Sequence, residues 1–170
     1  MENKATDNPQ KFFNPEEYIT KIIGVAENEA EETSNNKEID LLTSLITDPK
    51  HKDAKEETLL FLKKDKKEEF LLMAIAQQKN KTFMAMLVAA CWESEINFSK
   101  YLPFFILLVL DKDYLVSLEA ITVISEMKGP FEQEHLKQAV TKIKDAKKTI
   151  TNERVVLLND LVDTLNGFMK

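Results

Sequence analysis

Glycine is scarce in this sequence. Three glycines occur in 170 residues, which is under 2% of the chain, whereas soluble proteins average ~7%. Glycine supplies the positive φ angles of hairpin turns and lets the backbone approach a phosphate closely. The shortage therefore argues against β-rich folds, nucleotide-binding glycine loops and a nucleophile elbow.

Cysteine and histidine are also rare. The one cysteine, Cys91, has no partner for an internal disulfide, and with two histidines it cannot complete a structural zinc site. We therefore expect no metal and no cofactor. The N-terminus lacks the pattern of a signal peptide, and the longest apolar run, 102–110, is about half a membrane span. These features predict a cytoplasmic protein with no membrane partner.

Arginine is nearly absent. Of the 23 basic residues, 22 are lysine and one is Arg154. The net charge is −6, and residues 1–58 alone contribute −7, from 7 basic and 14 acidic side chains. Nucleic-acid recognition depends on positive charge and on the guanidinium fork. A nucleic-acid partner is therefore disfavoured.

Apolar residues recur at helical spacing along most of the chain, with short polar breaks between the segments. This pattern predicts an all-α protein with a flexible tail over 1–13 and a single domain over 14–170. The first helix should begin with Asn14 as N-cap and Pro15 at the first helical position, and 31–36 should be a polar linker. The expected helices are 14–30, 39–47, 53–64, 67–79, 82–95, 99–110, 113–127, 131–146 and 152–168.

The chain matches itself at an offset of 31 residues without a gap. Aromatic residues fall on aromatic residues and turns fall on turns, and such periods indicate helical repeats. Chance agreement between two amphipathic helices is the alternative explanation. The pairs are Phe70 with Tyr101, Leu71 with Leu102, Ile75 with Ile106, Asn80-Lys81 with Asp111-Lys112, Phe83 with Tyr114, and Leu87 with Leu118. The best repeat units are then 67–98 and 99–129.

The second unit resembles a HEAT-type repeat of the armadillo-like superfamily. It has a first helix that opens with Leu102-Pro103, an acidic turn at Asp111-Lys112-Asp113, and a second helix with Ala120 near its middle. It departs from the family pattern at Leu115-Val116, where a Val-Arg pair is usual. The resemblance implies a right-handed α-solenoid, or superhelix, of about four stacked antiparallel helix pairs. It also implies that a protein or peptide binds along the concave surface formed by the second helices.

A narrow polar arc on helix 113–127 is the candidate partner-binding surface. Glu119, Thr122, Ser125 and Glu126 share this arc, and the repeat places Glu95 beside them. The repeat-equivalent positions Val88, Cys91, Ser94 and Glu95 could continue the same strip. The arc is either a binding groove for a basic or polar peptide, or an ordinary solvated side of the helix.

Trp92 and Cys91 also have two interpretations each. The repeat pairs Trp92 with buried Val123, which favours a core tryptophan over an exposed binding anchor. Cys91 falls on the polar arc, but neither His51 nor His135 can be placed beside it as a base. We therefore interpret Cys91 as structural rather than catalytic.

Three classes of function remain open. The leading hypothesis is a non-catalytic scaffold that binds a protein or peptide, and the alternative is a nucleic-acid-binding or DNA-processing helical repeat. An enzyme is the third, but the sequence shows no convergent acid, base and nucleophile and no evident small-molecule substrate.

Overall fold

The computed structural model describes residues 29–110, 113–150 and 152–170. Over these ranges the chain is all-helical, with eight α-helices, two short 3₁₀ helices and no strand, so the prediction of an all-α protein is confirmed. The elements are α2 (Glu29–Thr47), η2 (Pro49–His51), α3 (Lys52–Asp65), α4 (Glu68–Gln77), α5 (Lys81–Glu93), η3 (Ser99–Tyr101), α6 (Leu102–Leu110), α7 (Tyr114–Ser125), α8 (Gln133–Ala146) and α9 (Asn152–Phe168).

Most predicted helix boundaries agree with the structure to within two residues from Lys52 onward. The predicted linker at 31–36 is wrong, because these residues lie inside α2. Polar residues without glycine or proline do not end a helix, and glutamate is a good helix former. The predicted start at Asn14 and Pro15 lies outside the described residues.

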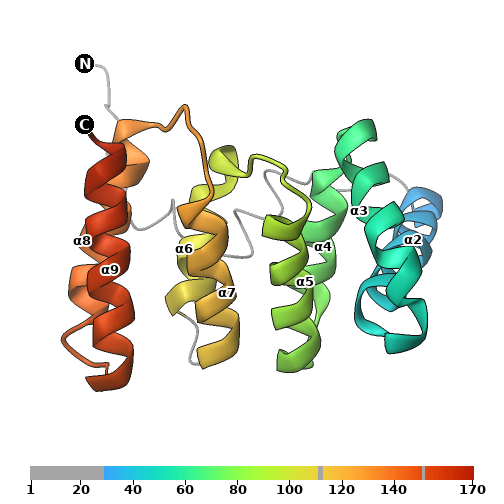
Figure 1. Ribbon diagram of the computed structural model, residues 1–170, viewed down its shortest axis with the longest axis horizontal. Helices are drawn as coiled ribbons and strands as arrows, with labels where there is room; N and C mark the ends of the chain where they lie inside the picture. The colour runs from blue at the N-terminus through green and yellow to red at the C-terminus, as the bar shows by residue number, and fades with distance from the viewer. Residues whose placement is uncertain (1–28, 111–112, 151) are drawn as a thin grey trace, which may run out of the picture.

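The helices follow one another along the long axis of the molecule in chain order, from α2 and α3 at one end to α8 and α9 at the other (Figure 1). Consecutive helices pack together, as α2 does with α3, α4 with α5, α6 with α7, and α8 with α9. Packing also joins neighbours, since α5 contacts α7, α6 contacts α8, and α7 contacts α9. Each inner helix is therefore buried on several sides.

One continuous apolar core runs through the described helices. At its centre Phe105 of α6 is fully buried, with ring centroids 5.6 Å from Phe98 and 5.4 Å from Phe104 in edge-on contacts. Such contacts add to the energy of burial. The aromatic cluster fixes α6 against the 3₁₀ turn that precedes it.

Tyr101 links this cluster to α4. Its ring is buried, its hydroxyl donates to Glu69 Oε1 at 2.9 Å, and the adjacent Lys100 forms an ion pair with Glu68. Burial, together with the hydrogen bond to Glu69, raises the pKa of Tyr101 to about 12. The hydroxyl therefore keeps its proton while the protein is folded.

This pKa predicts a separate tyrosine titration at high pH. The chain has three tyrosines, and we expect one of them, Tyr101, to ionise near pH 12. An unfolded tyrosine ionises near pH ~10, so the stabilising contribution of Tyr101 is complete below that pH and is lost as the pH rises toward 12. Phenolate absorbance measures this, and Tyr101→Phe should remove the phase near pH 12. Simultaneous ionisation of all three tyrosines in the folded protein would contradict the burial.

The link between α7 and α8 is longer than the predicted helices 113–127 and 131–146 leave room for. The helix α7 ends at Ser125 and α8 begins at Gln133, and Gly129 between them has a φ of 55°. The side chain of Asn97 donates to Gly129 O at 2.9 Å, and Phe131 stacks on Phe168 of α9 at 4.4 Å. These two contacts hold the segment as a non-helical bridge.

The ungapped pairing at 31 residues fails in the second helices. In α4 and α6 it pairs buried residues correctly, such as Leu71 with Leu102 and Ile75 with Ile106. In α5 and α7 buried positions correspond at an offset of 33, as in Cys91 with Ile124. Two residues rotate a helix by about 200°. The ungapped pairing therefore matches the buried side of α5 with the outer side of α7.

Candidate functional site

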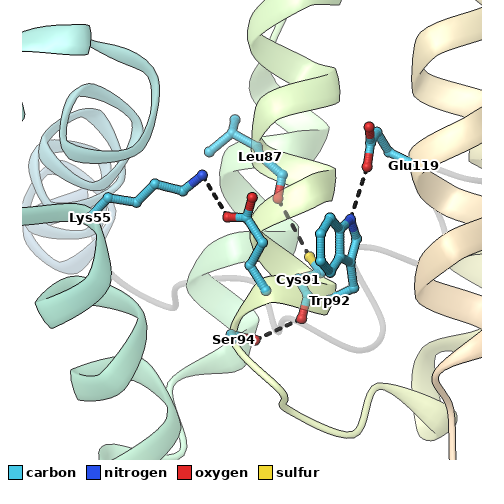
Figure 2. A network of polar contacts seen from close by, with 7 residues as sticks. Lys55, Leu87, Cys91, Trp92, Ser94 and Glu119 are labelled. Carbon is cyan, nitrogen blue, oxygen red and sulfur yellow. Dashed lines mark hydrogen bonds and ion pairs between the residues drawn. The ribbon is translucent and has the colours of Figure 1, made fainter. Parts of the chain in front are cut away.

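Trp92 lies on the surface of α5 and points toward α7 (Figure 2). Its side chain is 38% exposed, and the indole Nε1 donates a hydrogen bond of 2.9 Å to Glu119 Oε2. The prediction that Trp92 belongs to the core is wrong. The error follows from the 31-residue pairing with buried Val123, since at an offset of 33 its counterpart is exposed Ser125.

The helix that carries Glu119 is built around a buried side and an outer side. Asp113 caps α7 by accepting a hydrogen bond from Val116 N at 3.1 Å. The inner side consists of apolar residues that are nearly inaccessible, namely Val116, Ala120, Val123 and Ile124. Glu119 therefore lies at the edge that faces α5.

Two leucines on α7 are exposed. Leu118 is 36% exposed, although its partner in the 31-residue pairing, Leu87, is fully buried, and Leu115 is 53% exposed. Both lie on the outer side of the helix, beside the polar arc. The arc is thus part of a mixed surface of apolar and acidic groups.

Thr122 and Glu126 share this outer side with Glu119. The Thr122 hydroxyl donates to Leu118 O within its own helix at 3.1 Å, so its hydrogen is already used. The Glu126 carboxylate is exposed, and no side chain among the described residues pairs with it. Glu119 and Glu126 are therefore the charged groups of this surface, and Thr122 contributes mainly its methyl group and acceptor oxygen.

Glu95 belongs to a different contact. It follows α5 with a φ of 54°, and its carboxylate accepts a hydrogen bond from Lys63 of α3 at 2.8 Å. The hydrogen bond and charge of Lys63 lower the pKa of Glu95. A second ion pair, between Lys55 and Glu93, also joins α3 to α5 (Figure 2). Glu95 thus pairs with α3, whereas Glu119 pairs with Trp92.

The strip expected along α5 does not exist as a surface. Val88, Cys91 and Ser94 are all buried. The Cys91 thiol donates to Leu87 O at 3.6 Å, and Ser94 Oγ donates to Cys91 O at 2.7 Å. Burial raises the pKa of Cys91, which keeps the thiol protonated and unreactive. The expectation that Cys91 lies on the polar arc is wrong, while its environment fits a structural residue.

Among residues 29–110, 113–150 and 152–170, no group of three or more histidine, cysteine or acidic residues is placed so that it could hold a metal ion. In the same part of the chain, none of the helices has both the length and the apolar character needed to cross a bilayer.

We call the surface formed by Trp92, Leu115, Leu118, Glu119, Thr122 and Glu126 the Trp92 face. It combines an aromatic ring, two leucines and two carboxylates on two packed helices. Sequence reasoning found its polar members but missed Trp92 and the leucines. The capping residues carried the missing signal, because Asn80 caps α5 and Asp113 caps α7, which are 33 residues apart.

Comparison with known proteins adds no relative. No protein-family model matches this chain, and neither the curated proteins nor the solved structures contain a significant match.

Proposed function

We propose that this protein is a non-catalytic interaction module that binds a basic, amphipathic peptide or protein segment across α5 and α7. In this proposal the helices form a right-handed solenoid of the HEAT or armadillo type, and the ligand lies along the second helices. The chain-order arrangement, with α5 against α7 and α7 against α9, supports it. A cytoplasmic location remains part of the proposal.

The hydrogen bond between Trp92 and Glu119 carries the proposal. Tryptophan is enriched among the residues that dominate binding energy at protein interfaces. Here the indole nitrogen already has a partner, so the ring can contact a ligand without leaving a polar group unsatisfied. The bond also restricts the rotamers of both side chains, which reduces the entropy lost on binding.

The charge of the Trp92 face selects the ligand. Glu119 and Glu126 are its ionised groups, and α7 contains no lysine or arginine. A lysine or arginine of a ligand can therefore meet a carboxylate and lie over the ring of Trp92. Apolar ligand residues can contact Leu115 and Leu118. Nucleic acid fits this surface poorly, because its phosphates would meet the carboxylates.

Selection from a displayed library of random peptides tests the proposal. We expect peptides selected on the wild-type protein to combine basic and apolar residues. Trp92→Ala should weaken their binding by about 2 kcal/mol, or about thirtyfold in Kd. Phe83→Ala is the matched control, because Phe83 is a 40% exposed aromatic residue on the same helix, and it should leave the Kd unchanged.

Two results would refute the proposal. One is equal affinity of the selected peptides for the wild type and Trp92→Ala, which would place the binding surface elsewhere. The other is tight binding of a labelled DNA or RNA duplex that weakens steeply with salt, which would favour the nucleic-acid alternative.

A further inference from the structure

An apolar groove lies at the opposite end of the described chain from α9. It is bounded by α2, α3 and the beginning of α4, and its volume is about 440 Å³. Leu41 of α2 and Phe61 of α3 line it, and they are 60% and 50% exposed. Phe70 of α4 lines it too. This groove is separate from the Trp92 face.

The groove is poorly suited to remain open to water. Exposed leucine and phenylalanine side chains that line one groove form an apolar patch, and such patches mark sites where another element binds. Lys67 lies 5.3 Å from the Phe61 ring centroid and 5.7 Å from that of Phe70, so its cation sits at the rim. The occupant should therefore be a helix that presents an apolar side to the groove and polar residues to its rim.

We propose that residues 15–28 of this chain occupy the groove as an amphipathic helix that folds back along α2. The geometry of the groove and the pattern of the segment both support this assignment. On a helical wheel its apolar residues share one side, and its polar residues Glu17, Thr20 and Glu27 share the other. The apolar set is Tyr18, Ile19, Ile22, Ile23, Val25 and Ala26.

The length of the segment suits the groove. The described chain begins at Glu29, the first residue of α2, and α2 forms one wall of the groove. Leu41 lies 12 residues further on, about 18 Å along the helix axis. A helix within residues 15–28 that runs antiparallel to α2 covers the same distance. Because the segment is tethered to α2, its effective concentration at the groove is on the order of millimolar.

Thiol labelling in the full-length chain tests this proposal. Leu41→Cys places a thiol in the groove, and Val156→Cys places one at an equally exposed position on α9, since both parent side chains are 60% exposed. The native Cys91 is buried, so the thiol reagent should label it slowly in both variants while they are folded. If the segment covers the groove, Leu41→Cys should react about tenfold more slowly than Val156→Cys, as about 90% coverage requires.

Variants of the segment identify the occupant. Ile19→Asp with Ile22→Asp should raise the labelling rate of Leu41→Cys to that of Val156→Cys. Thr20→Asp with Asn28→Asp adds the same charge to the polar side and should leave the rate low. The rate of Val156→Cys in each background shows whether the fold is intact.

Three outcomes would overturn the proposal. Leu41→Cys could react as fast as Val156→Cys in the otherwise wild-type chain, which would mean that the groove is open. Its slow rate could persist in the Ile19→Asp and Ile22→Asp background, which would exclude the segment as the cover. Protection that grows with protein concentration would instead identify a second copy of the chain.

Discussion

Phe105→Ala should lower the free energy of unfolding by about 3–5 kcal/mol, the usual loss when a buried phenylalanine is truncated. Phe105 is fully buried and contacts the rings of Phe98 and Phe104. Its removal leaves a cavity at the junction of η3 and α6, where the neighbouring rings are held by other contacts and cannot close the space. Denaturant unfolding of the full chain measures the loss.

The same substitution at an exposed position provides the control. Phe83 is 40% exposed at the start of α5, so Phe83→Ala should cost less than about 1 kcal/mol. Equal losses at the two positions would contradict the placement of Phe105 at the centre of the core.

Arg154→Met should have the second-largest effect on stability, a loss of about 2–4 kcal/mol, because hydrogen bonds to charged groups contribute ~1.5–3 kcal/mol each. The Arg154 Nη2 donates to Val109 O at 2.7 Å and to Ser117 Oγ at 2.8 Å. Val109 O is one of the last carbonyls of α6, which have no partner within the helix. The guanidinium therefore caps α6 and ties α9 to both α6 and α7.

One further variant separates charge from geometry at this position, and a second variant nearby is the control. Arg154→Lys keeps the charge but not the planar fork, so its loss should be intermediate. Val156→Ala, at a 60% exposed position on the same helix, should cost less than about 0.5 kcal/mol. Hydrogen exchange in Arg154→Met should accelerate first in α9. If α9 keeps wild-type protection in that variant, the guanidinium does not hold it in place.

The helices could be predicted because their signals are local. Apolar spacing and the polar breaks placed most boundaries from Lys52 onward within two residues of the structure. The break expected at 31–36 failed for a physical reason, since polarity alone does not stop a helix that lacks glycine and proline. The bridge between α7 and α8 depends on contacts with Asn97 and Phe168, which are distant in sequence.

The sides of the helices were harder to predict than the helices themselves. The segment from η3 through α6 is two residues longer than α4, so an ungapped alignment carries a two-residue error into α7. That error reversed the assignments of Trp92 and Cys91. Glu119, Thr122 and Glu126 were placed outward correctly, because they were found from the wheel of α7 itself.

The hydrogen bond between Trp92 and Glu119 could not be predicted from the sequence. It joins residues 27 positions apart on two helices whose separation depends on packing. The contact between Glu95 and Lys63 is of the same kind. The sequence alone had placed Glu95 beside the acidic groups of α7, whereas in the structure its partner Lys63 lies on α3.

The central claim is that a basic ligand binds the Trp92 face, and calorimetry with a selected peptide tests it most directly. Glu119→Lys with Glu126→Lys should weaken binding by at least about 1–2 kcal/mol, or about five- to thirtyfold in Kd. Asp160→Lys with Asp163→Lys makes the same change of charge at exposed positions on α9 and should weaken binding much less. Unchanged affinity in the Glu119 and Glu126 variant, with the fold intact, would contradict the account.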